Sequence, residues 1–240
     1  MIYICSQPDI PYFHWQVEVL LTNFQSIEIE KCHIIFIFDG APSREGKMLE
    51  KKFPQYNFFF YKDERELRAR YYIPTIKPYG MLEHFRNNKI KEAIFYHDSD
   101  IVLTEKLDEK RLEKGSKWYL SDTISYIGHD YVKSKGEDQL DQMCYLIGID
   151  RAVVEANQKS SGGAQYVCKN TTTEFWAKVY HDSYLLYEML CETEKDWKGE
   201  GYSIQKWCAE MWATLWNVWL FDYKTVVDKE LDFEIGRAHV

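Results

Sequence analysis

Short apolar runs alternate with segments of mixed apolar and polar residues along the first hundred positions of the chain. Four runs are predicted to be strands, and they occupy residues 2–5, 33–38, 57–61 and 93–96. The run at 33–38 is almost continuously apolar, which is typical of a strand buried on both faces of a sheet. Residues 6–9, Ser-Gln-Pro-Asp, are predicted to form the loop after the first strand.

Segments with helical spacing of apolar residues separate these predicted strands. The first covers residues 12–24, and its predicted buried stripe consists of Trp15, Val19, Leu20 and Phe24, with Gln16 at the edge. Two further helices are predicted at 43–52, capped by Ser43, and at 78–86, where Pro78 suits the first turn. Strands alternating with helices predict a mainly parallel central sheet with right-handed crossovers, flanked by helices.

After residue 100 the predicted strands and helices no longer alternate regularly. Strands are predicted at 118–121, near Ile127 and at 164–168, and helices are predicted at 138–147, 151–156, 174–192 and 203–220. Residues 160–163, Ser-Ser-Gly-Gly, are predicted to form a loop that either lets the backbone approach a ligand closely or is merely a turn. We expect all segments from 1 to 233 to form a single α/β domain.

Composition narrows the possible functions. A chain of 240 residues, 45% of them hydrophobic, can bury a sizeable core. Its 18 Tyr, 13 Phe and 8 Trp suggest a cleft with aromatic walls as well as an aromatic core. Because 38 acidic residues outnumber 30 basic ones, for a net charge of −8, no nucleic acid is expected to bind through a basic face. A phosphate-bearing small molecule would need a metal ion or a local lysine.

The spacing of the cysteines, the apolar runs and the ends of the chain lead to expectations about the compartment, membrane spans and the native C-terminus. The six cysteines show no Cys-x-x-Cys spacing, and we expect reduced, buried thiols in a cytoplasmic protein. No apolar run approaches the roughly 18 residues of a membrane span, and no basic leader precedes the first strand. Residues 234–240 can be back-translated into a common sequencing-adapter read, so we expect a non-native tail and a C-terminus truncated after about residue 233.

The sequence Asp98-Ser99-Asp100 directly follows the fourth predicted strand. In open α/β sheets, ligands bind outside the carboxyl ends of the strands, and two aspartates there can face one hard cation. Mg²⁺ or Mn²⁺ on Asp98 and Asp100 would neutralise the charge that develops on a leaving diphosphate, and Asp98 also suits ribose hydroxyls. The alternative is a solvated turn. Lys77, ahead of a predicted helix, either adds a positive charge to the same phosphates or is simply solvated.

Five segments of the chain resemble, in their order, nucleotide-sugar glycosyltransferases of the GT-A fold: HWQVEVLLTNF, IKPYGMLEHF, FYHDSDIVL, SSGGAQYVCKNTTTEFWAKV and WCAEMWATLW. They are most similar to the peptidyl-serine galactosyltransferase and hydroxyproline arabinosyltransferase group. The resemblance implies a GT-A-like domain that transfers a sugar from a nucleoside diphosphate sugar, with Asp98 and Asp100 on metal and nucleotide. Gln16 and Ser99 are expected to join them in binding the donor. The residues implied to line the donor and acceptor cleft are Lys77, Gly162, Gly163, Gln165, Glu210 and Met211.

Glu210 lies in the tryptophan-rich segment 203–220. A lone carboxylate there is either a paired structural residue or a group suited to acid–base work or to holding sugar hydroxyls. If the reaction inverts the anomeric centre, Glu210 is the candidate base, whereas a retaining reaction requires none. The resemblance also implies a late histidine ligand to the metal, and no convincing one follows Glu210 in this chain.

These patterns together predict a metal-dependent glycosyltransferase that moves a hexose or pentose from a nucleoside diphosphate sugar, most simply a UDP-sugar, to a hydroxyl acceptor. One alternative is a nucleotidyltransferase, although residues 6–9 lack the glycine- and basic-rich loop that such an enzyme would normally have after its first strand. A second alternative is an inactive nucleotide- or carbohydrate-binding relic of the same fold.

Overall fold

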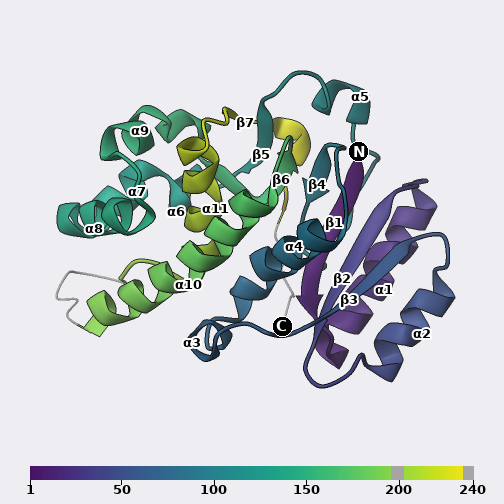
Figure 1. Ribbon diagram of the computed structural model, residues 1–240. Coiled ribbons are helices and arrows are strands. Elements are labelled where there is room, and N and C mark those ends of the chain that lie inside the picture. The colour runs from purple at the N-terminus through teal and green to yellow at the C-terminus, as the bar shows by residue number, and fades with distance from the viewer. Residues whose placement is uncertain (196–202, 235–240) are drawn as a thin grey trace, which may run out of the picture.

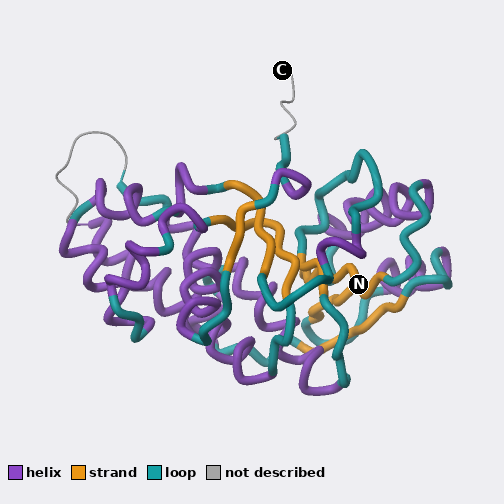
Figure 2. The backbone as a smooth tube through the Cα atoms, turned by 90° about the horizontal axis from the view of Figure 1, so that it is seen from above, coloured by secondary structure: helices purple, strands orange, loops and turns teal. Residues whose placement is uncertain are grey.

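A seven-stranded sheet forms the centre of the molecule, as the computed structural model shows for residues 1–195 and 203–234. The strand order is β3-β2-β1-β4-β6-β5-β7. The strands are β1 (Ile2–Pro8), β2 (Cys32–Phe38), β3 (Asn57–Lys62), β4 (Ile94–Tyr96), β5 (Trp118–Asp122), β6 (Gly162–Cys168) and β7 (Thr225–Val227). Figure 2 shows them running through the middle of the molecule between groups of helices.

The sheet is mainly parallel. Strands β3, β2, β1 and β4 pair in parallel, β6 runs antiparallel to both β4 and β5, and β5 pairs in parallel with β7. The predicted class, a single α/β domain with a mainly parallel sheet flanked by helices, is therefore confirmed.

Helices cover both faces of this sheet. They are α1 (Pro11–Ser26), α2 (Arg44–Lys52), α3 (Leu67–Arg70), α4 (Ile76–Asn87), α5 (Glu109–Leu112), α6 (Ile124–Ile127), α7 (His129–Lys135), α8 (Glu137–Ile147), α9 (Arg151–Ala156), α10 (Thr173–Lys195) and α11 (Ala209–Leu220). Short 3₁₀ turns lie at Ile73–Thr75, Gln158–Ser160, Lys206–Cys208 and Lys229–Leu231. In Figure 1, α4 crosses in front of the first strands, and α10 and α11 lie beside it.

Alternation along the strands divides the core into two parts. Ile2 and Ile4 of β1 pack with α4, α10 and α11 on one face, whereas Tyr3 and Cys5 pack with α1 and α2 on the other. Successive side chains of a strand point to opposite faces, so an all-apolar strand serves two cores at once. The apolar runs at 2–5, 33–38 and 93–96 thus became strands that are buried on both faces, whereas the run at 57–61 became the half-buried edge strand β3.

Helix α4 packs unusually close to β1. A Cβ atom at Gly80 would lie 1.9 Å from Ser6 Oγ, so only a glycine fits at this position. The Ser6 hydroxyl donates a hydrogen bond to the carbonyl oxygen of Ile76, 3.1 Å away, at the start of the helix. This close approach fixes the first turn of α4, which carries Lys77, next to the carboxyl end of β1.

Two predictions about the first hundred residues are wrong. Trp15 and Val19 of α1 are exposed, because the buried stripe of this helix follows Val17, Leu20 and Phe24. The predicted loop at residues 6–9 is also incorrect, since β1 continues to Pro8 and pairs with β2 as far as Ile37. The Gln7 side chain satisfies part of its own hydrogen bonding there by donating to Ile35 O at 2.9 Å.

Three predictions about the later residues are also corrected. The segment near Ile127 is helical, since it belongs to α6 rather than to a strand. Gly162 and Gly163 open β6 instead of forming a loop, and a Cβ at Gly162 would lie 2.4 Å from Ser121 O of the neighbouring strand. Helix α11 begins only at Ala209, after a 3₁₀ turn. The expected tail falls mostly on residues 235–240, which lie outside the described residues.

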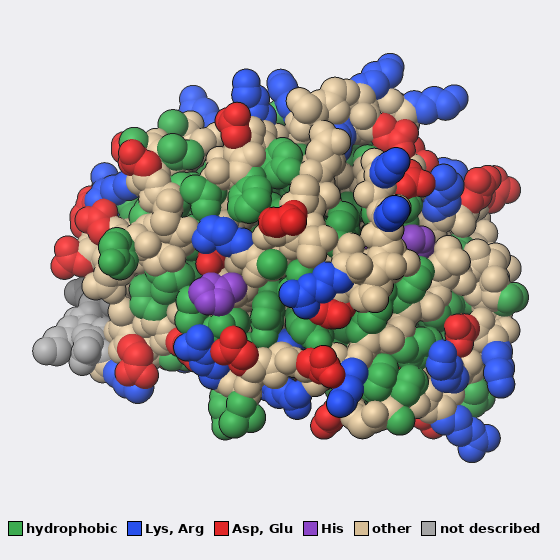
Figure 3. Space-filling view, viewed as in Figure 1, with side chains coloured by type: hydrophobic (Ala, Val, Ile, Leu, Met, Phe, Trp, Pro, Cys, Tyr) green, Lys and Arg blue, Asp and Glu red, His purple; other side chains and the backbone are tan. Residues whose placement is uncertain are grey.

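The surface and the cysteines add little to the assignment of function. All six cysteines are free thiols, and five of them are buried. Among the residues described, no helix is long and apolar enough to cross a membrane. On the face of the described molecule drawn in Figure 3, basic and acidic side chains are interspersed instead of gathering into a stripe of one sign.

Candidate functional site

A cavity lies where the order of the strands reverses. The chain runs from β1 to β2 and β3 on one side, and then returns to place β4 on the other side of β1. Such a switch point leaves a crevice outside the carboxyl ends of the two central strands. A cavity of about 320 Å³ opens there, lined by Ser6, Gln7, Pro8, Tyr12, Phe13, Gln16, Ile73, Pro74, Ile76, Lys77, Asp98, Ser99, Asp100, Trp207, Cys208, Glu210 and Met211.

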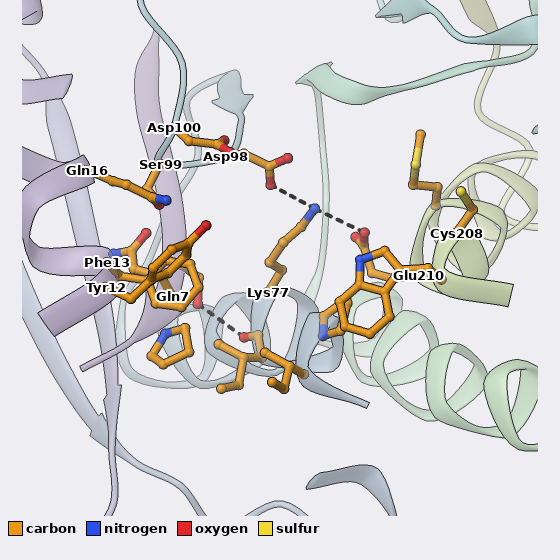
Figure 4. Close-up of a pocket in the computed structure, with 17 residues that line it drawn as sticks. Gln7, Tyr12, Phe13, Gln16, Lys77, Asp98, Ser99, Asp100, Cys208 and Glu210 are labelled. Carbon is orange, nitrogen blue, oxygen red and sulfur yellow. Dashed lines mark hydrogen bonds and ion pairs between the residues drawn. The ribbon is translucent and has the colours of Figure 1, made fainter. Parts of the chain in front are cut away.

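The first wall of this cavity, the strand-end wall, combines the ends of β1 and β4 with one side of α1. Two of its polar side chains are hydrogen-bonded to each other. Ser99 Oγ donates to Gln16 Oε1 at 2.9 Å, and both side chains are buried. Gln7 is also buried, and its Oε1 has no partner within the described structure. Figure 4 shows Gln16 and Ser99 together on one side of the cavity, with Tyr12 and Phe13 below them.

The Asp98–Asp100 loop is anchored by the histidine that precedes it. His97 is buried, and its Nδ1 lies 2.8 Å from the carbonyl oxygen of Asp98, which it contacts as a donor in the Nδ1–H tautomer. Burial lowers the pKa of His97 to about 4, and the hydrogen bond to Asp98 only partly offsets this effect. The neutral ring stacks against Phe95.

Lys77 connects the two walls. Its Nζ lies 2.8 Å from Asp98 Oδ1 and 3.1 Å from Glu210 Oε2, as the dashed lines in Figure 4 mark. Burial alone would lower the pKa of Lys77, but the charges of Asp98 and Glu210 outweigh it and raise the pKa above its ordinary value. The side chain is therefore a charged ammonium group on the floor of the cavity, and of the two alternatives for Lys77 the simply solvated lysine is excluded.

The second wall, the helix wall, is formed by the Lys206–Cys208 turn and the start of α11. Tyr72 holds this start in place, because its hydroxyl accepts from Glu210 N at 3.0 Å and donates to Trp207 O. The buried Glu210 carboxylate also contacts the hydroxyls of Tyr96 and Thr214, at 3.3 and 3.2 Å from Oε1. Its position in the first helical turn is favourable for a negative charge.

Three other titratable groups that line or adjoin the cavity have raised pKa values. Burial, followed by the charge of Asp98, raises the pKa of the Asp100 carboxyl, so these two groups repel each other. Burial and the neighbouring Glu210 raise the pKa of Cys208 to about 11, which leaves this thiol protonated and unreactive at neutral pH. Burial and Glu210 likewise keep Tyr96 protonated as a hydrogen-bond donor by raising its pKa well above the usual value.

The carboxylates of Asp98 and Asp100 fit a small hard cation that is shared with a phosphate ligand. Among residues 1–195 and 203–234, no cluster of three or more His, Cys, Asp or Glu side chains is arranged to enclose a metal ion. Mg²⁺ is usually bound by one or two carboxylates together with substrate phosphates and water, so two aspartates suffice in such a site. Burial and, second, the charge of Asp98 raise the pKa of Asp100, and a cation beside this carboxylate would offset both effects.

Most of the residues predicted for the site meet in this cavity. Gln16, Lys77, Asp98, Ser99, Asp100, Glu210 and Met211 all line it. Gly162, Gly163 and Gln165 do not belong to its lining. Gly163 instead lies behind Met211, since a Cβ there would be 2.9 Å from Met211 Cε, and the Gln165 backbone nitrogen donates to Ser121 Oγ at 3.3 Å.

The sequence patterns did not single out several residues that build the cavity. Ser6, Gln7 and Pro8 were assigned to a loop, although the carboxyl-end rule that singled out Asp98 applies equally to the strand beside it. Tyr72, which fixes the start of α11, carried no sequence signal at all, because it lies 138 residues from its partner Glu210.

The fold and the cavity define an α/β protein with a cavity at the carboxyl edge of a mainly parallel sheet. No protein-family profile and no curated protein sequence matches the chain. Among solved structures, it is similar to the galactosyltransferase LgtC in complex with donor and acceptor sugar analogs, at 14% identity and a TM-score of 0.44 over 88% of this chain and 70% of that one. It is also similar to mouse xyloside xylosyltransferase 1 in its apo form, at 11% identity and a TM-score of 0.44 over 98% of this chain and 84% of that one. At these values the likeness assigns neither an activity nor a substrate to this protein.

Proposed function

We propose that this protein is a metal-dependent glycosyltransferase that moves a monosaccharide from a nucleoside diphosphate sugar, most simply a UDP-sugar, to a hydroxyl acceptor. The observation that carries the proposal is the charged floor of the cavity, where Lys77 lies between Asp98 and Glu210 at the switch point of the sheet. A diphosphate needs positive charge and a sugar needs hydrogen-bond acceptors, and this floor offers both groups within one cavity.

On the donor side, Asp98 and Asp100 would hold Mg²⁺ or Mn²⁺ together with the diphosphate, and Lys77 would contact the phosphate oxygens. When bound, the metal ion supplies charge neutralisation to the leaving diphosphate. Gln16 and Ser99, already hydrogen-bonded to each other, would orient the nucleotide on the strand-end wall. The backbone at Lys77 is held against β1, so the ammonium changes partners only by rotation within its own side chain.

On the acceptor side, Glu210 is the residue that we propose for catalysis. In an inverting reaction its carboxylate would accept the proton of the attacking hydroxyl, and in a retaining reaction it would hold sugar hydroxyls. Trp207 and Ile73 are exposed at the mouth of the cavity and offer apolar surfaces for a sugar ring. Met211 completes this side, and Gly163 packs against it.

Thermal denaturation with a panel of nucleoside diphosphates, with and without Mn²⁺, tests the donor side of this proposal. We expect UDP or a related diphosphate to raise the melting temperature of the parent protein only when the metal is present. Asp100→Ala should abolish this stabilisation, because it removes one of the two carboxylates. Asp130→Ala, an exposed aspartate outside the cavity lining, is the matched control.

Product analysis separates the proposed reaction from its rivals. A glycosyltransferase releases the nucleoside diphosphate from a UDP-sugar, by transfer or slowly to water, whereas a nucleotidyltransferase makes or consumes pyrophosphate with a nucleoside triphosphate. Diphosphate binding without metal, or no binding to any member of the panel, would contradict the metal-dependent transferase. Metal-dependent binding without turnover of any sugar donor would favour a binding relic.

A further inference from the structure

Lys77 occupies the place that a cation would take beside Asp98. Its Nζ lies 2.8 Å from Asp98 Oδ1, and its side chain is only 21% exposed. The same ammonium reaches Glu210 Oε2 at 3.1 Å, so one positive charge balances two carboxylates from opposite walls. In Figure 4, Lys77 points from α4 into the gap between these two acidic side chains.

We propose that Lys77 is an internal counter-ion that makes the binding of the divalent cation depend on the diphosphate. The inference rests on the proposed function, and it assigns to Lys77 a role beyond contact with phosphate. Asp98 Oδ1 cannot serve the ammonium and a metal ion at full strength together, because two positive charges a few ångströms apart repel each other strongly in a partly buried site. The metal ion alone therefore binds weakly.

A diphosphate removes this competition. Its oxygens carry enough negative charge to accept hydrogen bonds from Lys77 and to coordinate the metal ion at once. Lys77 then turns from Asp98 toward the phosphate, and Asp98 becomes available to the metal. Cation and nucleotide consequently bind together far better than either binds alone, and the site does not take up a metal ion without its donor.

Mn²⁺ binding to Lys77 variants tests the proposal, and the loss of the electron paramagnetic resonance signal of free Mn²⁺ measures it. Lys77→Met should bind Mn²⁺ alone about tenfold more tightly than the parent, because the competing charge is gone. In the presence of UDP the same variant should bind Mn²⁺ about tenfold more weakly than the parent, since the phosphate has lost a charged donor. Lys77→Arg, which keeps the charge, should restore the behaviour of the parent.

The two opposite changes distinguish this role from simpler ones. A lysine that only contacts phosphate would leave binding of Mn²⁺ alone unchanged, and a lysine that only cross-links the walls would weaken both measurements. Either result would overturn the proposal. Lys178→Met is the matched control, because Lys178 also pairs with a buried carboxylate, Asp182 at 2.8 Å, but does not line the cavity.

The same measurements separate this inference from the proposed function. If the parent binds no Mn²⁺ even with UDP, the metal-dependent transferase itself is contradicted. If the parent binds Mn²⁺ and UDP together but Lys77→Met shows no gain with Mn²⁺ alone, only the counter-ion role is wrong. Circular dichroism would check the fold of each variant, and Lys77→Gln, which keeps a hydrogen-bond donor without the charge, replaces Lys77→Met if the latter does not fold.

Discussion

The two walls of the cavity are built in different ways. The strand-end wall consists of residues at or just after the ends of β1 and β4, together with one side of α1, and it is formed by the regular first half of the chain. The helix wall comes from α11, more than a hundred residues later, and Glu210 there contacts Tyr72, Tyr96 of β4 and Lys77 of α4. The strand-end wall follows from topology, whereas the helix wall depends on individual long-range contacts.

The two walls also differ in the ligand that we propose for each of them. The strand-end wall presents the two carboxylates of Asp98 and Asp100, so we propose that it takes the diphosphate with its metal ion. The helix wall presents a single buried carboxylate and an exposed indole, so it suits an uncharged hydroxyl acceptor. Lys77 is the one described lysine that lines the cavity, and it contacts both walls.

The largest effect is expected from Glu210→Gln, which changes the helix wall alone. Glutamine keeps the shape of the side chain and a carbonyl oxygen for Lys77 and Tyr96 but cannot accept a proton. We expect donor binding to be largely kept and transfer to fall by about 10²–10⁴-fold. Steady-state turnover with a UDP-sugar measures this effect, with the exposed Glu155→Gln as control. Unchanged turnover would remove Glu210 from catalysis.

The helix behind each wall carries a tryptophan, and the two tryptophans are expected to contribute very differently to the free energy of unfolding. Trp212 of α11 is fully buried and donates from Nε1 to Ile127 O at 2.9 Å, so Trp212→Ala should lower the free energy of unfolding by about 3–5 kcal/mol. Trp15 of α1 is exposed, and Trp15→Ala should change the free energy of unfolding by no more than about 0.5 kcal/mol. Urea denaturation measures both, and similar losses for the two variants would contradict the observed burial.

A pH dependence is expected from the histidine pair that packs α4 against β2. His33 Nδ1 lies 2.9 Å from His84 Nε2, and burial, the main cause in both residues, lowers the pKa of His33 to about 4 and that of His84 to about 3. Tyr61 and Asn88 also contact the His84 ring, and Glu92 opposes the shift of His33.

The sign of this effect follows from the direction of the shifts. The unfolded chain binds protons on these histidines below about pH 6.5, before the folded chain does, so stability is complete above that pH and is lost as the pH falls toward 4 and 3. We expect proton uptake on unfolding to lower the free energy of unfolding by roughly 3 kcal/mol for each of these histidines between pH 7 and pH 4. Denaturation of a His33→Gln, His84→Gln double variant at several pH values should show a flatter profile, and an equally steep one would contradict the assignment.

The smallest effect is expected at the cap of α2, next to the strand-end wall. Ser43 Oγ accepts a hydrogen bond from Gly46 N at 2.9 Å, and its own hydrogen bond to Asp9 links the cap to the end of β1. Ser43→Ala should lower the free energy of unfolding by about 1 kcal/mol. Thermal denaturation measures the loss, and Ser43→Thr, which keeps a hydroxyl that accepts from Gly46 N and donates to Asp9, should recover part of the capping energy.

Sequence reasoning succeeded where the signal was local. The strands β2 and β4 and the helix α9 lie where the apolar pattern predicted them, to within one residue at each end. It failed where a tertiary contact decided the outcome. Trp15 fits a helical stripe as well as Val17 does, and only the position of the sheet buries one and exposes the other. Gly162 and Gly163 look like a loop, yet β5 passes too close to Gly162 for any side chain.

The sequence by itself determined the alternation of strands and helices, the mainly parallel sheet and the two aspartates at the end of β4, because each depends on neighbouring residues and on general rules of topology. Only the tertiary structure decided that Lys77 joins Asp98 to Glu210. The physical reason is that an ion pair between residues 133 positions apart leaves no periodic trace in the chain. It exists only because Gly80 lets α4 approach β1 and Tyr72 holds α11 in place.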